Sequence, residues 1–207
     1  MTRVVFSLGS LALSLWVSAC VPVGPPRGAD APGSIEAGEG CRPWHAGTEE
    51  ERRQIDAWVF ELGTAHGEAL LDVGRRLLSR GEAAVPALVA ALSSDDAQRR
   101  GQAAYLLGFE KDRRTIGPLA EAAKDAVPAV RYEAAGALLE LRDPRGLPIL
   151  IDGLEDPDAR LRAKCLAVLA ERTGQRFGFE ADGSVEDRAA AVRRWRAWFA
   201  QKRAAGG

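Results

Sequence analysis

DAVPAVRYEAAGALLEL (residues 125–141) and EDPDARLRAKCLAVLA (residues 155–170) are two versions of one pattern. In each, an aspartate-rich turn precedes a run whose apolar residues recur at three- and four-residue spacings, the period of an amphipathic helix. Aspartate at a helix start accepts hydrogen bonds from backbone N–H groups that lack a helical partner. VPALVAAL (residues 85–92) has the same helical spacing. The pattern predicts pairs of short helices joined by tight turns.

The chain repeats itself when it is shifted by 31 residues, from Val85 to Ile116 and on to Leu147. This predicts three helical hairpins over residues 82–112, 113–143 and 144–174, with a degenerate copy at 49–81. One such hairpin cannot bury its own apolar stripe, so stability must come from stacking. The other matching columns are Leu88/Leu119/Leu150, Arg100/Arg131/Arg162, Ala103/Ala134/Cys165 and Leu107/Leu138/Leu169.

These segments resemble HEAT repeats, in particular the short type first noted in phycobilin lyases. An aspartate six residues before the arginine is a hallmark of that family, and Asp125/Arg131 and Asp156/Arg162 have this spacing. The first regular copy has Ser94 in its place. The resemblance implies an all-α fold, a right-handed α-α superhelix (HEAT-like solenoid) of about four helical hairpins. The repeat domain is expected over residues 49–201, with a capping helix at 185–201.

The N-terminal residues 1–19 have the pattern of a signal peptide, with Arg3 ahead of an apolar run that is too short to span a membrane. Val17–Cys20 resembles the lipobox of bacterial lipoproteins, which implies lipidation of Cys20. Ordinary signal cleavage after Ala19 is the alternative. Residues 20–48 are rich in Pro and Gly and are expected to form a tether. Val21 follows the cysteine, which favours the outer membrane, facing the periplasm.

Charge and composition set limits on the partners. The 28 basic and 29 acidic residues give a net charge of −1, which does not favour nucleic acid. Cys41 and His45 form at most half a metal site, so no metal and no cofactor are expected. A disulfide between Cys41 and Cys165 is open, although Cys165 stands in an alanine column and is expected in the core.

The arginines recur at the same position of each repeat and form a row of positive charges, or ladder, that could bind phosphate. In HEAT arrays such arginines tie the stack together, and this structural role is preferred here. The expected ladder comprises Arg100, Arg131 and Arg162 with Asp125 and Asp156.

The main functional hypothesis is a membrane-anchored adaptor or scaffold that binds an unidentified envelope protein and is not an enzyme. The candidate protein-binding residues, expected on the exposed side of the second helices, are Tyr105, Tyr132, Gln102, Glu133 and Lys164. Tyrosine provides large contact area at low entropy cost. The alternative for both tyrosines is that they fill gaps between helices.

The second hypothesis is an enzyme or enzyme subunit with a site near the loop at 176–184, the longest connection in the repeat region. No catalytic spacing such as GxSxG or HExxH accompanies this loop. Trp195, Trp198 and Phe199 fall on one stripe of the following helix, and are interpreted as a cap over the last repeat rather than a binding patch.

Overall fold

The computed structural model describes residues 43–45 and 47–205; the expected signal peptide, Cys20, Cys41 and most of the expected tether lie outside them. Within this part, nine α-helices and two 3₁₀ turns occur and no strand. The all-α solenoid of helical hairpins with a closing helix is therefore confirmed. The hairpins are α1 (Glu49–Glu61) with α2 (Gly67–Leu78), α3 (Val85–Ala91) with α4 (Ala97–Glu110), α5 (Ile116–Ala122) with α6 (Pro128–Glu140), and α7 (Gly146–Gly153) with α8 (Ala159–Thr173), followed by α9 (Val185–Ala205).

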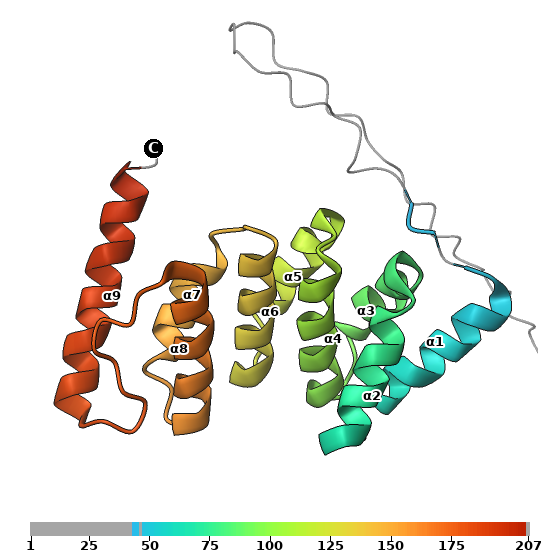
Figure 1. Ribbon diagram of the computed structural model, residues 1–207, viewed down its shortest axis with the longest axis horizontal. Coiled ribbons are helices and arrows are strands. Elements are labelled where there is room, and N and C mark those ends of the chain that lie inside the picture. Colours follow the sequence, from blue (N-terminus) through green and yellow to red (C-terminus); the bar gives the residue numbers. More distant parts are fainter. Residues whose placement is uncertain (1–42, 46, 206–207) are drawn as a thin grey trace, which may run out of the picture. The chain divides into compact units, whose positions relative to one another are not determined.

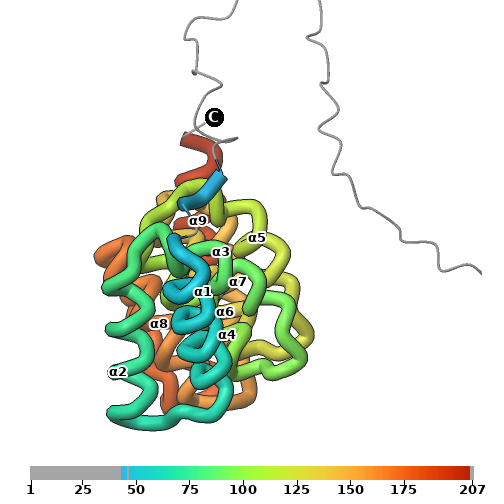
Figure 2. The backbone as a smooth tube through the Cα atoms, turned by 90° about the vertical axis from the view of Figure 1, so that its right-hand side faces the viewer, coloured from blue at the N-terminus to red at the C-terminus, as the bar shows by residue number. Residues whose placement is uncertain are grey.

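The hairpins follow one another in a row, and α9 stands at the end of it (Figure 1). Helix α4 packs against α6, and α6 packs against both α7 and α8. Viewed along the row, α2 and α8 lie toward one side and α3, α5 and α7 toward the other (Figure 2). Within the regular hairpins each first helix packs against its second helix, α3 against α4, α5 against α6 and α7 against α8.

Small residues allow the second helices to approach closely. Ala103, Ala104, Ala134 and Ala135 are completely buried. At Gly108 of α4, an added Cβ would lie 3.0 Å from the Cα of Ala137 on α6. Because interiors are packed as densely as organic crystals, a larger side chain at this contact would push the two helices apart.

The inter-helix turns are built alike in all three regular repeats. Asp125 Oδ1 accepts a hydrogen bond from the backbone N of Val127 at 2.8 Å, and Asp156 Oδ1 accepts one from Asp158 at 2.8 Å. Ser94 Oγ accepts the equivalent bond from Asp96 at 3.2 Å. A short polar side chain that bonds the backbone two residues on is a standard way to fix a turn. This local chemistry explains why serine can replace aspartate in the first copy.

Tyr132 and Gly153 form a complementary pair. Tyr132 on α6 aligns with Gly101 and Ala163 in the neighbouring copies, and Gly153 on α7 aligns with Ala91 and Ala122. A Cβ on Gly153 would lie 2.8 Å from Cε1 of the Tyr132 ring, closer than real contacts allow. One copy of the repeat therefore has a large residue where its neighbours have a small one, and the next copy lacks a methyl group opposite it.

This packing predicts that Gly153→Ala destabilises the protein by about 1–3 kcal/mol, because the added methyl group would overlap the sulfur of Cys165 and the ring of Tyr132. Gly117→Ala is the matched control, since no atom lies within 4 Å of its added Cβ. The control should be neutral or stabilise by up to about 1 kcal/mol, because glycine is a poor helix former. Urea denaturation of both variants measures the difference; equal stabilities would contradict the packing described here.

Candidate functional site

The arginine of each regular repeat bonds the turn that precedes its own helix. Arg100 Nη1 donates to the carbonyl oxygens of Ser94 at 2.7 Å and Asp95 at 3.1 Å. Arg131 Nη1 donates to Asp125 and Ala126 at 2.8 and 3.0 Å, and Arg162 Nη1 to Asp156 and Pro157 at 2.8 and 2.9 Å. The six-residue spacing thus joins each arginine to a backbone carbonyl and not to the aspartate carboxylate.

The carboxylates bond the neighbouring repeat instead. Arg100 donates from Nε and Nη2 to the two oxygens of Asp125, at 2.7 and 3.1 Å. This paired hydrogen bond lowers the pKa of Asp125 below its ordinary value. In the next copy the equivalent Asp156 accepts a bond from the hydroxyl of Tyr132 at 2.9 Å. Burial, together with this bond, raises the pKa of Tyr132 to about 12, so the phenol remains a donor.

Arg162 belongs to the last repeat, and its remaining donors bond the segment that leads to α9. Both Nε and Nη2 donate to the carbonyl oxygen of Ala181, at 2.8 and 2.5 Å. Arg188 bonds the carbonyl of Gly183, and Phe179 is 1% exposed. The segment between α8 and α9 is therefore fixed against the solenoid, although its sequence is not part of the repeat.

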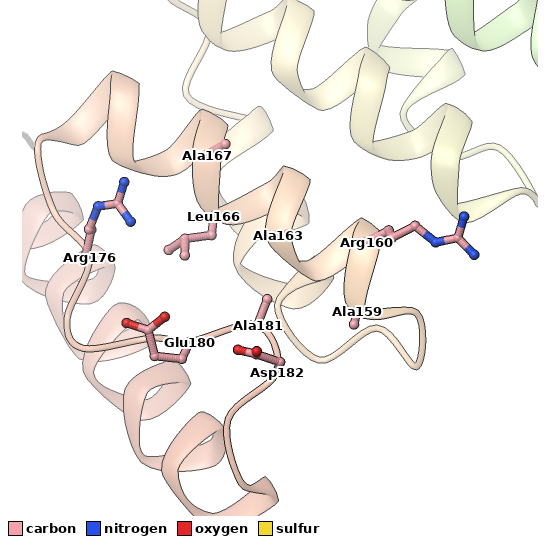
Figure 3. A pocket seen from close by; sticks show the side chains of 9 residues that line it. All are labelled: Ala159, Arg160, Ala163, Leu166, Ala167, Arg176, Glu180, Ala181 and Asp182. Atoms are coloured by element: carbon pink, nitrogen blue, oxygen red, sulfur yellow. The ribbon is translucent and has the colours of Figure 1, made fainter.

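A pocket of about 480 Å³ lies between this segment and α8 (Figure 3). Leu166 and the alanines of α8 line one side, and Arg176, Glu180 and Asp182 line the other, while the side chain of Arg160 extends outward (Figure 3). Neither Glu180 nor Asp182 has an ion-pair partner in the part of the chain that the structure describes. The length of the connection was the one sequence feature that pointed here, and it did not identify these side chains.

The residues expected to form a protein-binding face do not share one open surface. Tyr105 is 45% exposed, but Tyr132 is 6% exposed, because its ring is covered by α7. The placement of Tyr132 on an exposed face is therefore wrong, and the gap-filling alternative describes it. Glu133 forms an ion pair with Lys164 between α6 and α8. Gln102 lies partly buried on α4 beside Tyr105. A binding role for these residues stays a prediction.

Other predicted features have simple structural outcomes. Cys165 is completely buried, and burial raises the pKa of its thiol to about 12. Trp195 is also completely buried, and its ring meets that of Phe177 edge-on with centroids 4.8 Å apart. Among residues 43–45 and 47–205, no three His, Cys, Asp or Glu side chains are grouped so that they could hold a metal ion. None of the described helices has the length and apolar character needed to cross a membrane.

Comparison with known proteins identifies the repeats. Residues 85–170 match the family described as HEAT repeats. This match covers the three regular copies from the start of α3 to near the end of α8. The chain therefore contains HEAT repeats, as the sequence pattern indicated.

The curated relatives are enzymes. The chain is 35% identical to deoxyhypusine hydroxylase-B of Oryza sativa subsp. japonica over 105 residues, which is 48% of this chain and 35% of the relative. It is 33% identical to deoxyhypusine hydroxylase of Bos taurus over 130 residues, 56% of this chain and 43% of the relative. The solved structure of human deoxyhypusine hydroxylase in complex with glycerol matches at 27% identity with a TM-score of 0.40, over 64% of this chain and 48% of that one. This chain thus spans less than half the length of these relatives.

These relatives correct the main functional hypothesis. The prediction of a non-enzymatic adaptor that binds an envelope protein is contradicted, because the matching proteins are named as hydroxylases. The predicted lipid anchor and periplasmic location are contradicted as well, since the relatives come from a plant, an insect and vertebrates, which have no periplasm. The periodicity that predicted the solenoid is common to adaptors and enzymes, so it could not separate them.

The contact between Arg100 and Asp125 predicts a pH-dependent stability. Asp125→Asn should destabilise by about 1–3 kcal/mol at neutral pH, because the partly buried guanidinium of Arg100 loses a charged partner. The pKa of Asp125 is lowered in the folded state, so this contribution is present above the unfolded pKa of about 4 and is lost as the pH falls further.

Denaturant titrations of the native protein and Asp125→Asn between pH 7 and pH 2 check this expectation. Glu121→Gln is the control, because its pair with Lys124 is exposed and should contribute about 0.5 kcal/mol or less. A difference between native protein and Asp125→Asn that stays constant down to pH 2 would contradict the assignment.

Proposed function

We propose that this chain is an enzyme or a subunit of an enzyme, with its substrate site in the pocket between α8 and residues 176–182. The observation that carries the proposal is the bond from Arg162 to Ala181, which fixes a non-repetitive segment as the wall of a pocket. Binding sites need supporting residues that hold them in a defined geometry. The similarity of the repeats to deoxyhypusine hydroxylases supports an enzyme over an adaptor.

The lining of the pocket suits a cationic group on an apolar stem. Glu180 and Asp182 present two carboxylates, which accept strong hydrogen bonds from an ammonium group. Leu166, Ala163 and Ala167 form the apolar side against which methylene groups could pack. The volume of about 480 Å³ lies in the usual range of small-molecule pockets, about 300–1,000 Å³. A single long side chain of a protein substrate would fill such a space.

The name of the relatives supplies the first substrate to test. They are named for hydroxylating deoxyhypusine, and a deoxyhypusine side chain is the proposed occupant of this pocket. In this arrangement the chain's own residues bind and orient the substrate. Glu180 and Asp182 hold its positive charge, and Arg176 at the pocket's edge is placed to bond a carbonyl group of the substrate backbone.

A binding experiment with the full chain tests this proposal. A peptide that contains deoxyhypusine should bind, and the same peptide with norleucine at that position should bind at least about tenfold more weakly, a difference of about 1.4 kcal/mol. Glu180→Gln/Asp182→Asn should remove the preference, because the charge partners are lost. Glu68→Gln/Asp56→Asn, which changes the same charge far along the chain, should not. Calorimetry gives the affinities, and mass spectrometry of the peptide reports any gain of an oxygen atom.

Equal affinity for the two peptides would rule out a cation site. Retention of the preference in the Glu180→Gln/Asp182→Asn protein would place the substrate elsewhere.

A further inference from the structure

A second concave surface is lined by the ends of α4, α6, α8 and α9 and by the start of α7. It is a groove of about 1220 Å³. We call it the basic groove, because Lys111, Arg142, Arg172, Lys202 and Arg203 line it against the two carboxylates of Glu140 and Asp143. Both carboxylates are already paired, Glu140 with Arg172 and Asp143 with Arg145. The groove therefore presents an excess of positive charge.

The other four cations have no carboxylate partner within the described residues. Lys202 lies over the ring of Trp198 and Arg203 over that of Phe199, each 6.0 Å from the ring centroid. All four are exposed. A ligand can therefore bind these four side chains without breaking an existing ion pair.

The backbone at two of these positions adds an independent observation. Lys111 and Arg142 occupy equivalent positions in successive repeats, at the ends of α4 and α6, and both are in the left-handed region, with φ of 53° and 61°. Glycine adopts this conformation freely and usually ends helices there, whereas a side chain with a Cβ is strained by about 1–2 kcal/mol. Strain retained at the same position in two copies is a recognised sign of function.

The spacing of the cations favours an extended chain over a compact anion. Lys111, Arg142 and the Lys202–Arg203 pair come from the ends of three different helices, and the ends of α6 and α9 point to the same side (Figure 1). Helices α4 and α6 pack against each other, and the axes of packed helices lie about 8–10 Å apart. An extended peptide in the polyproline II conformation has three residues per turn and advances about 3.1 Å per residue, so acidic side chains three residues apart lie on one face about 9 Å from each other and can meet neighbouring helix ends.

We propose that the basic groove binds an extended acidic segment of a protein, whose carboxylates bond Lys111, Arg142, Lys202 and Arg203. Trp198, Phe199 and Leu147 give apolar surface for the side chains between the acids. The volume exceeds the range of about 300–1,000 Å³ that is usual for small ligands, which also favours a peptide over a single phosphate group. This site is separate from the pocket beside α8 and does not depend on the substrate proposed for it.

Fluorescence polarisation with the full chain tests the acidic-segment site. The probe is a fluorescein-labelled peptide with glutamate at about every third position, the repeat of polyproline II, and serine between. Its counterpart has glutamine in place of glutamate. Only the acidic peptide should bind, with an affinity that falls as salt is added.

Substitution of the cations should separate a binding role from a structural one. Lys111→Gly/Arg142→Gly should weaken binding about tenfold or more while the melting temperature stays the same or rises, because glycine relieves the left-handed strain. Lys202→Gln/Arg203→Gln, in the exposed last turn of α9, should weaken binding with no effect on folding. Arg75→Gln/Arg193→Gln removes the same charge outside the groove and should leave binding unchanged.

The proposal is overturned if the acidic and glutamine peptides bind alike, or if the acidic peptide does not bind. It is also overturned if the variants with groove substitutions bind as tightly as Arg75→Gln/Arg193→Gln. Binding of inorganic polyphosphate without binding of the acidic peptide would assign the groove to phosphate instead.

Discussion

Each turn between the two helices of a regular repeat exposes carbonyl groups that no helix can bond, and one arginine per repeat bonds two of them. Arg100, Arg131 and Arg162 do so with nearly identical distances. A carbonyl group that is partly buried without a donor costs free energy, so these side chains stabilise the turns. The remaining N–H donors of Arg100 and Arg162 then bond the next segment of the structure, Asp125 for Arg100 and Ala181 for Arg162. The stacking of the hairpins is built on this local requirement.

The same chemistry produces the candidate site where the repeats stop. Arg100 bonds the carboxylate of Asp125 in the next hairpin, whereas in the described residues α8 is followed by an irregular segment and the single helix α9. Its donors bond Ala181 instead, and a stretch without helical structure is held beside α8. A pocket with Glu180 and Asp182 results. The arginine that stabilises the turn in each repeat thus also supports the proposed substrate pocket after the last one.

Much of the fold could be predicted from the sequence, because amphipathic spacing and the 31-residue shift both report on burial. The burial of Tyr132 could not, since it depends on a methyl group missing at Gly153 in a different helix. The pocket residues were also missed, because Glu180 and Asp182 acquire their setting through Arg162 and not through any local motif. The choice between adaptor and enzyme failed because the repeat pattern encodes packing, which both classes of protein share.

Hydrogen exchange of the Arg162→Leu protein tests most directly whether this arginine supports the pocket. Leucine fills much of the space of the arginine side chain but has no hydrogen-bond donor. Arg160→Leu, at an exposed neighbouring position, is the control. We expect faster exchange in residues 176–184 of the Arg162→Leu protein, with α4 and α6 protected as in the native protein, and no change in the Arg160→Leu protein. Native protection of residues 176–184 in Arg162→Leu would contradict this expectation.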